Sequence, residues 1–351
     1  MSNGNIFWNR SERRLRALWR LLIQGIAWFV LLFVGQALVG ALWGIIAVAT
    51  GAVTLEEMSD PAAVTQAIMS RPGLMLALQV LSFVAVMLTV WLAGRFLDKR
   101  RFADFGLHLN GAWWADFAFG LLLGAVLMAL IFAVELAAGW IDVTGFFVTQ
   151  NPATPFALAI LLPALIFILV GIGEEVLSRG YQLTNLAEGL RGMGAVPAVI
   201  VATIIQAAFF GLLHATNPNA SFVSTFNIFL AGIFLAVGYV LTGRLAIPIG
   251  LHMTWNFFQG NVFGFPVSGM DFRAATFISV QQGGPEAWTG GAFGPEAGLI
   301  GIGAMVLGTL LTVLWVRLRE GHAGIETAIA EPPERVQREM ASAATVEPTA
   351  Y

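Results

Sequence analysis

Long apolar runs, separated by short polar segments, dominate the pattern of this chain. Most of them approach or exceed the roughly 20 residues that a helix needs to cross the hydrocarbon core of a bilayer. The pattern predicts eight spans: Leu21–Thr50, Leu74–Leu97, Phe117–Trp140, Phe156–Ile172, Ala195–Leu213, Phe222–Leu241, Ile247–Val262 and Gly298–Val316. We therefore expect an all-α fold, a polytopic membrane helical bundle with about eight transmembrane helices.

The composition agrees with this fold class and limits the kinds of partner that the protein can be expected to bind. Of the 351 residues, 58% are hydrophobic and only 11% are charged, whereas about 25% are charged in ordinary soluble domains. The net charge is −3 and basic residues form only short clusters, so the lipid bilayer is the expected partner and nucleic acid is not. The chain has no cysteine, which excludes disulfides, thiolate metal sites and a thiol nucleophile.

Basic residues next to the spans predict the orientation. Because cytoplasmic loops carry an excess of Lys and Arg, we expect both termini in the cytoplasm. The residues on which this rests are Arg10, Arg13, Arg14, Arg16 and Arg20 before the first span, Arg95, Lys99, Arg100 and Arg101 after the second, and Arg317 and Arg319 after the last. We expect residues 1–20 to be a basic cytoplasmic segment and 21–316 the transmembrane domain. Residues 317–351 should be a cytoplasmic tail, disordered or loosely helical from about Gly321, and Gly264–Pro295 an external loop.

Two adjacent acids, Glu174 and Glu175, end the fourth apolar run. An ionisable residue at membrane depth costs several kcal/mol, so such residues mark functional sites. On a helix Glu175 and Arg179 share a face and can pair, while Glu174 points about 100° away and is free to face a cavity. A simple salt bridge at the helix end is the alternative interpretation, but it explains Glu175 and not Glu174.

Two histidines, His214 and His252, lie at the ends of later apolar runs, and Asn256 follows His252 by one helical turn. Neutral imidazole binds Zn²⁺ well, and a carboxylate completes a His₂Glu set that leaves one position for water. A lone membrane histidine is more often a hydrogen-bonded packing residue, so the metal interpretation depends on Glu174, His214 and His252 together.

The three groups can meet if the fourth and fifth spans form a hairpin. At 1.5 Å per residue, Glu174 lies about 22 Å and His214 about 28 Å along their helices from the shared turn Leu190–Gly194. His252 follows the short turn Thr242–Arg244 on the same side. We therefore expect one acid and two imidazoles from three helices to converge within the membrane.

These residues form three ordered motifs on successive helices: Glu-Glu-x-x-x-Arg at 174–179, Phe-x-x-x-His at 210–214 and His-x-x-x-Asn at 252–256. This order resembles the CPBP family of intramembrane proteases, which includes the CAAX prenyl endopeptidases related to Rce1 and the bacterial Abi proteins. The resemblance covers about Pro155–Gly269. Ser178 departs from it, because the family often carries Phe before the Arg, which concerns packing or substrate fit.

The resemblance implies a membrane protease that hydrolyses a peptide bond inside a membrane cavity. Glu174 and His214 would activate water, while His252 and Asn256 would bind metal or stabilise the oxyanion. We expect a multi-pass endopeptidase of the bacterial inner (cytoplasmic) membrane that acts on a membrane-associated peptide or protein. The candidate catalytic set is Glu174, Glu175, Arg179, His214, His252 and Asn256. A divalent metal, Zn²⁺, is expected on Glu174, His214 and His252, with a metal-independent glutamate mechanism left open.

Two other functions fit the same residues less well. In a proton- or cation-coupled transporter, Glu174, His214 and His252 would form a relay, but Asn256 and Arg179 would have no task in it. In a non-catalytic, immunity-type scaffold, none of these side chains would be needed.

Overall fold

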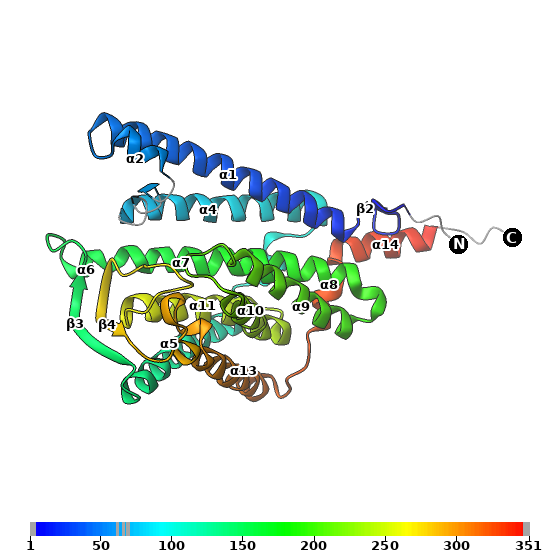
Figure 1. Cartoon of the computed structure of the whole chain (residues 1–351). Helices are drawn as coiled ribbons and strands as arrows, with labels where there is room; N and C mark the ends of the chain where they lie inside the picture. The colour runs from blue at the N-terminus through cyan, green and yellow to red at the C-terminus, as the bar shows by residue number, and fades with distance from the viewer. Residues whose placement is uncertain (1–4, 61–62, 65–66, 68–70, 347–351) are drawn as a thin grey trace.

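The computed structural model describes residues 5–60, 63–64, 67 and 71–346. Among them, seven helices are long and apolar enough to cross a membrane, which confirms the predicted polytopic helical bundle. They contain α1 (Ala17–Ala49), α4 (Pro72–Ala93), α5 (Gly111–Ala137), the continuous helix Phe156–Met193, α9 (Ala195–Leu213), α10 (Phe222–Thr242) and α13 (Leu299–Glu320). The strand β2 (Arg14–Leu15) and the helix α14 (Glu334–Val346) lie at the same end of the bundle (Figure 1). Which side of the membrane that end faces stays a prediction.

The helices form two groups. In Figure 1, α1 and α4 run side by side next to the rest of the bundle, and α4 is the member that contacts α7 (Leu161–Glu175). The outer helix α1 exposes a row of large apolar side chains, among them Phe29, Phe33 and Leu38, as expected for a helix that faces lipid.

The continuous helix Phe156–Met193 runs the length of the bundle. It comprises α6 (Phe156–Ala159), α7, a π-helical segment at Val176–Leu183, α8 (Thr184–Leu190) and a final 3₁₀ turn at Arg191–Met193. The π-helical segment begins directly after Glu175; such segments are rare and are frequent at functional sites. Gly194, with a φ of 99°, then reverses the chain into α9, so the predicted hairpin is present.

The predicted span Ile247–Val262 differs from the other seven. It contains α11 (Ala246–Phe257), of 12 residues, and a π-helical segment at Phe258–Val262. At 1.5 Å per residue α11 is about 18 Å long, shorter than the roughly 30 Å hydrocarbon core. Its buried residues include Ile249, Leu251 and His252, so the seventh predicted span is a short helix inside the bundle.

Glycine brings α11 into the centre of the bundle. A Cβ atom on Gly120 of α5 would lie 2.4 Å from the carbonyl oxygen of Ile247, and one on Gly250 of α11 would lie 2.5 Å from that of Phe117. Neither position has room for a side chain, so the two backbones pack as membrane helices do through small residues.

A strand of a two-stranded antiparallel sheet replaces part of the predicted external loop Gly264–Pro295. The strand β4 (Ala275–Gln282) pairs antiparallel with β3 (Ile141–Thr149), with Ile141 opposite Gln282 and Thr149 opposite Ala275. The prediction of a plain loop was wrong because β4 pairs with a strand far away in the sequence. This two-stranded sheet lies at the end of the bundle opposite to α14 (Figure 1).

The turn 264–270, which we call the cap turn, is fixed by one buried acid. Glu296 is 3% exposed, and its Oε1 accepts hydrogen bonds from the backbone N–H (2.5 Å) and the hydroxyl (2.6 Å) of Ser268. Gln259 donates to the other carboxylate oxygen and to the carbonyl of Pro266. Burial outweighs these donors and raises the pKa of Glu296 above its ordinary value.

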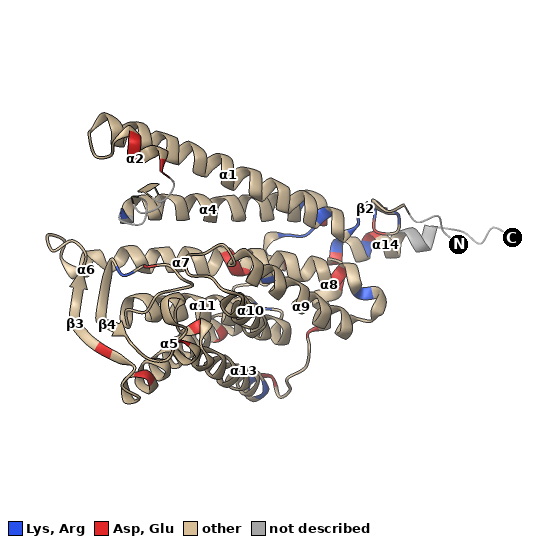
Figure 2. Cartoon of the chain, in the orientation of Figure 1, with Lys and Arg blue, Asp and Glu red and all other residues tan. Residues whose placement is uncertain are grey.

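Charged side chains gather at the end of the bundle where β2, α8 and α14 lie (Figure 2). Glu188 of α8 is the centre of this cluster. Its carboxylate accepts from Arg14, from Arg20 at 2.5 Å and from Arg100 at 3.0 Å, and all four side chains are at most 7% exposed. Residues before α1, within α1 and after α4 are thereby tied to one helix.

The tail is folded where the structure describes it, and its second half forms the helix α14, so residues 321–346 fit the helical alternative and not the disordered one. Ile329 and Ala330 are buried in the apolar core at this end. Arg100 donates to the carbonyl of Glu331 at 2.6 Å, and Lys99 pairs with Glu339 at 2.6 Å. A few apolar residues and basic partners on another loop hold the tail, which its composition does not reveal. Residues 347–351 lie outside the described residues.

We expect Glu188→Ala to destabilise the protein strongly. Removing the carboxylate leaves three buried guanidinium groups without their shared partner, and breaking a buried ion pair costs about 3–5 kcal/mol. Thermal unfolding of the purified protein in detergent should show a clearly lower Tm. The matched control is Glu334→Ala, which removes an ion pair whose side chains are 78% and 81% exposed and should leave Tm unchanged. An equal Tm for both variants would contradict this account of the cluster.

The raised pKa of Glu296 predicts a pH dependence of stability. Between the ordinary pKa, about 4.5, and the raised one, the folded protein keeps a proton that the unfolded chain loses. The contribution of Glu296 to stability is therefore complete below the ordinary value and declines as pH rises toward the folded-state pKa. Measured from about pH 5 to 8, Tm should fall more steeply for the wild type than for Glu296→Gln. Parallel pH profiles would refute the assignment.

Candidate active site

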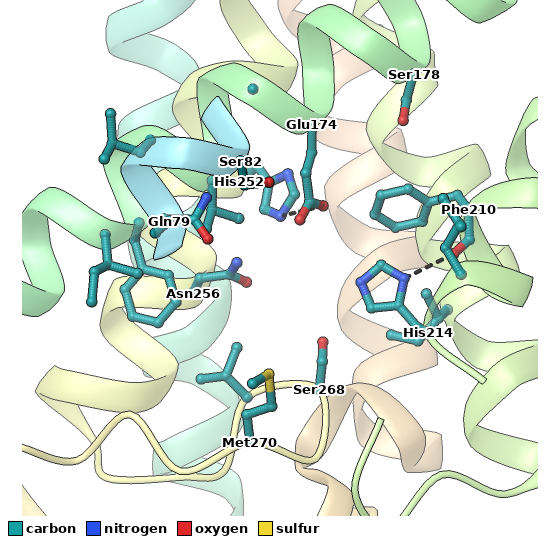
Figure 3. A pocket seen from close by; sticks show the side chains of 18 of the residues that line it. Gln79, Ser82, Glu174, Ser178, Phe210, His214, His252, Asn256, Ser268 and Met270 are labelled. Carbon is teal, nitrogen blue, oxygen red and sulfur yellow. Dashed lines mark hydrogen bonds and ion pairs between the residues drawn. The ribbon is translucent and has the colours of Figure 1, made fainter. Parts of the chain in front are cut away.

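A cavity of about 510 Å³ lies between α4, α7, α9, α10 and α11. It has the volume expected of a site for a small molecule or a short peptide. Glu174, His214, His252 and Asn256, four of the six predicted site residues, line it. In the close view their side chains point into the same space from three sides (Figure 3).

The two adjacent acids have different surroundings. Glu175 is fully buried, and its Oε1 accepts from Arg179 at 2.7 Å and from Nδ1 of His252 at 2.8 Å. The Glu174 side chain is 38% exposed, and its Oε2 lies 3.9 Å from Nε2 of His252, beyond hydrogen-bonding distance. The pairing of Glu175 with Arg179, predicted from helical periodicity, is present, and Glu174 is the acid that faces the cavity.

Arg179 lies behind the cavity wall. It is 0% exposed, donates to the carbonyl of Gly232 on α10 at 2.9 Å, and its guanidinium lies 4.5 Å from the ring centroid of Phe210 on α9. Each contact is with a different helix. Arg179 and Glu175 therefore join α7, α9, α10 and α11 around the cavity, and neither one lines it.

The two histidines present the same nitrogen to the cavity. Nδ1 of His214 lies 2.8 Å from the carbonyl oxygen of Phe210, and because a carbonyl only accepts, this nitrogen carries the proton. In His252 the proton on Nδ1 is likewise directed to Glu175. In each neutral ring Nε2 is then an acceptor with a free lone pair. With Glu174, the cavity has three acceptor groups.

Asn256 adds a hydrogen-bond donor. It lies one turn after His252 on α11 and lines the cavity. Within the described residues its amide makes no hydrogen bond to another group of the chain. It can therefore donate to a molecule in the cavity, as the sequence predicts.

Other polar residues of the cavity were not singled out in the sequence. Trp28 on α1, Gln79 and Ser82 on α4, and Ser268 of the cap turn all line it. Single polar residues inside apolar spans are a weak signal without a structure. The partner of the Ser268 hydroxyl, Glu296, comes from the loop before α13, which the family motifs do not cover.

The donor chemistry of the site suits a divalent metal such as Zn²⁺. Each histidine is held through Nδ1 by a carboxylate or a carbonyl and keeps Nε2 free, which is the usual surrounding of a metal-ligating imidazole. Yet in the described part of the chain, no three His, Asp or Glu side chains are close enough together to hold one ion. The predicted set of Glu174, His214 and His252 has suitable groups, and His214 stands apart from the other two (Figure 3).

Comparisons with known proteins agree with the motifs. The model of the family described as type II CAAX prenyl endopeptidase Rce1-like matches residues 155–258. The uncharacterized protein YyaK of Bacillus subtilis is 29% identical over 203 residues, 55% of this chain and 62% of that protein. The membrane-embedded CAAX protease MroQ of Staphylococcus aureus is 28% identical over 148 residues, 41% of this chain and 55% of that protein.

These matches span less than two thirds of either relative. No solved structure matches the chain. The family match ends two residues after Asn256 and contains all six predicted site residues. Residues 155–258 of this multi-pass membrane protein therefore match the Rce1-like family of CAAX prenyl endopeptidases.

Proposed function

We propose that this protein is an endopeptidase of the bacterial cytoplasmic membrane that hydrolyses a peptide bond of a membrane-associated substrate. The observation that carries the proposal is the set of acceptors, Glu174 and Nε2 of His214 and His252, around one cavity that also holds the amide of Asn256. A water molecule, with two protons to donate, matches these acceptors. The similarity to a CAAX protease supports the same function.

Amide hydrolysis needs an activated water, a donor for the oxyanion and a proton for the leaving amine. Glu174 takes a proton from the water, while an imidazole Nε2 accepts its other hydrogen and orients it. The water oxygen bonds to the carbonyl carbon, and Asn256 donates to the oxyanion. Glu174 then returns the proton to the amide nitrogen as the C–N bond breaks, which yields a carboxylic acid and an amine.

Glu175 and Arg179 are positioning residues in this scheme. The carboxylate of Glu175 fixes His252 with Nε2 toward Glu174, and Arg179 holds that carboxylate in place. Such supporting hydrogen bonds orient the groups that perform the chemistry.

A divalent metal would be held by Glu174, His252 and, after a movement of its side chain, His214. When bound it would lower the pKa of a coordinated water and polarise the substrate carbonyl. The protein residues keep their tasks with or without it, because Glu174 remains the group that moves the proton and Asn256 the oxyanion donor.

The transporter alternative is weaker because Asn256 is a donor without a protein partner in the described part of the chain, and a proton relay has no use for it. A scaffold would not need two histidines that direct the protonated Nδ1 away from the cavity and the acceptor Nε2 into it.

Glu174→Gln should abolish proteolysis while the protein still folds. General acid–base catalysis contributes about 10²–10⁴-fold, and an amide cannot take the proton from water. New N-termini in membranes from cells that produce wild type or variant, identified by mass spectrometry, would measure the activity. Glu56→Gln is the matched control, since Glu56 is exposed on α2 (Leu55–Ser59). Cleavage at the wild-type level in Glu174→Gln would sink the proposal.

Metal analysis tests the metal-dependent form of the mechanism. We expect about one Zn²⁺ per purified chain, held in the way that catalytic zinc sites hold it, and none in His252→Ala. Chelation should stop proteolysis and added Zn²⁺ should restore it. A wild-type protein that cleaves peptide bonds without bound metal would refute this form and leave the glutamate mechanism.

A further inference from the structure

The cavity is a slot along two helices. Its lining extends from Met75 to Val86 on α4, and from Ile166 on α7 to Ser178 in the π-helical segment that follows α7. At 1.5 Å per residue these stretches are about 17 and 18 Å long. An extended peptide rises about 3.3 Å per residue, so about five residues would fill the slot.

The α1 and α4 side of this slot carries polar groups without partners. Trp28 Nε1 is buried and has no hydrogen-bond partner in the part of the chain that the structure describes. Gln79 and Ser82, on α4, are half-buried, and within the described residues neither side chain bonds to another group of the chain. Both are labelled in Figure 3, on the part of α4 that borders the cavity.

Unpartnered donors and acceptors next to lipid are costly, because hydrocarbon offers nothing to bond them. A helical peptide would not satisfy them, since its own N–H and C=O groups are paired along the helix. An extended peptide has both kinds of group free along its length. The groups on α1 and α4 therefore match an extended backbone better than a helix.

Glu174 divides the slot unequally. It lies eight residues from Ile166 and four from Ser178 on one helix, or about 12 and 6 Å. An extended substrate with its scissile bond at Glu174 then has about three or four residues toward the α6 end of the slot and about two toward the α8 end.

We propose that α4 forms a substrate subsite in which Gln79 and Ser82, with Trp28 Nε1, bind the backbone of an unwound peptide segment of about five residues. This inference rests on the proposed function for the position of the scissile bond. The binding of an extended peptide does not require hydrolysis and can be measured without it.

The test uses the full-length Glu174→Gln protein in lipid nanodiscs and two fluorescent synthetic peptides of about 20 apolar residues. One peptide has a Gly-Pro pair at its centre, which breaks the helix, and the other has Ala-Leu there. Fluorescence anisotropy should give at least tenfold tighter binding of the helix-broken peptide. Gln79→Leu in the same protein should weaken that binding about tenfold, because a buried peptide group loses its partner.

Gln206→Leu is the matched control. Gln206 is likewise a glutamine of a spanning helix whose side chain has no hydrogen-bond partner among the described residues, but it is fully buried and does not line the cavity. This variant should bind both peptides as Glu174→Gln does. In the active protein, Gln79→Leu should raise KM about tenfold and leave kcat within about twofold, as loss of uniform binding does. A merely structural role of Gln79 would lower kcat as well.

The outcomes separate this inference from the proposed function. Equal binding of the two peptides, or no effect of Gln79→Leu on Kd, overturns the subsite even if the wild type cleaves peptides. Selective binding that depends on Gln79, with no cleavage by the wild type, supports the subsite and refutes the protease.

Discussion

The hydrogen-bonded group of Glu175, Arg179 and His252 is the interaction on which the site depends. All three side chains are buried, and the carboxylate receives two donors, one from its own helix and one from α11. Removing one member of such a group would leave a charge uncompensated far from water. Because the chain has few charged residues in its spans, this cluster defines the relative position of α7 and α11.

The fold brings α11 to that carboxylate by unusual means. The helix is too short to span a bilayer and is held by contacts at Gly120 and Gly250 that leave no room for side chains. It places His252 and Asn256 in the interior of the bundle, beside the point where α7 changes to π-helical geometry. A histidine on a regular lipid-facing helix could not reach the same place. The site residues therefore converge because α11 is short and because α7 continues as a π-helical segment.

Much of the site could be predicted because it depends on local geometry. Residues 175 and 179 share a helical face whatever surrounds them, and residue 174 cannot share it. The hairpin after Glu174 followed from helix lengths and a turn. The length of α11 could not be read in this way, because the helix continues past Phe257 as the π-helical segment Phe258–Val262, through which the predicted span was drawn.

The pairing of β3 with β4 joins segments more than 120 residues apart, and the sequence of neither segment indicates its pairing partner. The docked tail and the bond of Glu296 to the cap turn likewise depend on distant partners. Such contacts are set by the tertiary structure and override the local signals of the sequence.

The two sides of the cavity can bind different chemical groups. The α7, α9 and α11 side offers lone pairs at Glu174, His214 and His252, which call for a water molecule or a cation. The α4 side offers donors and acceptors that call for a peptide backbone. A substrate bound to α4 would therefore place its scissile carbonyl next to the water. It would not compete with the water for Glu174, His214 and His252. The helices α1 and α4 are joined to the other helices mainly through α7 and α8. A substrate segment from the bilayer would meet the polar groups on α4 only after it has left the lipid. It would therefore unwind inside the cavity, where its free backbone groups can form hydrogen bonds.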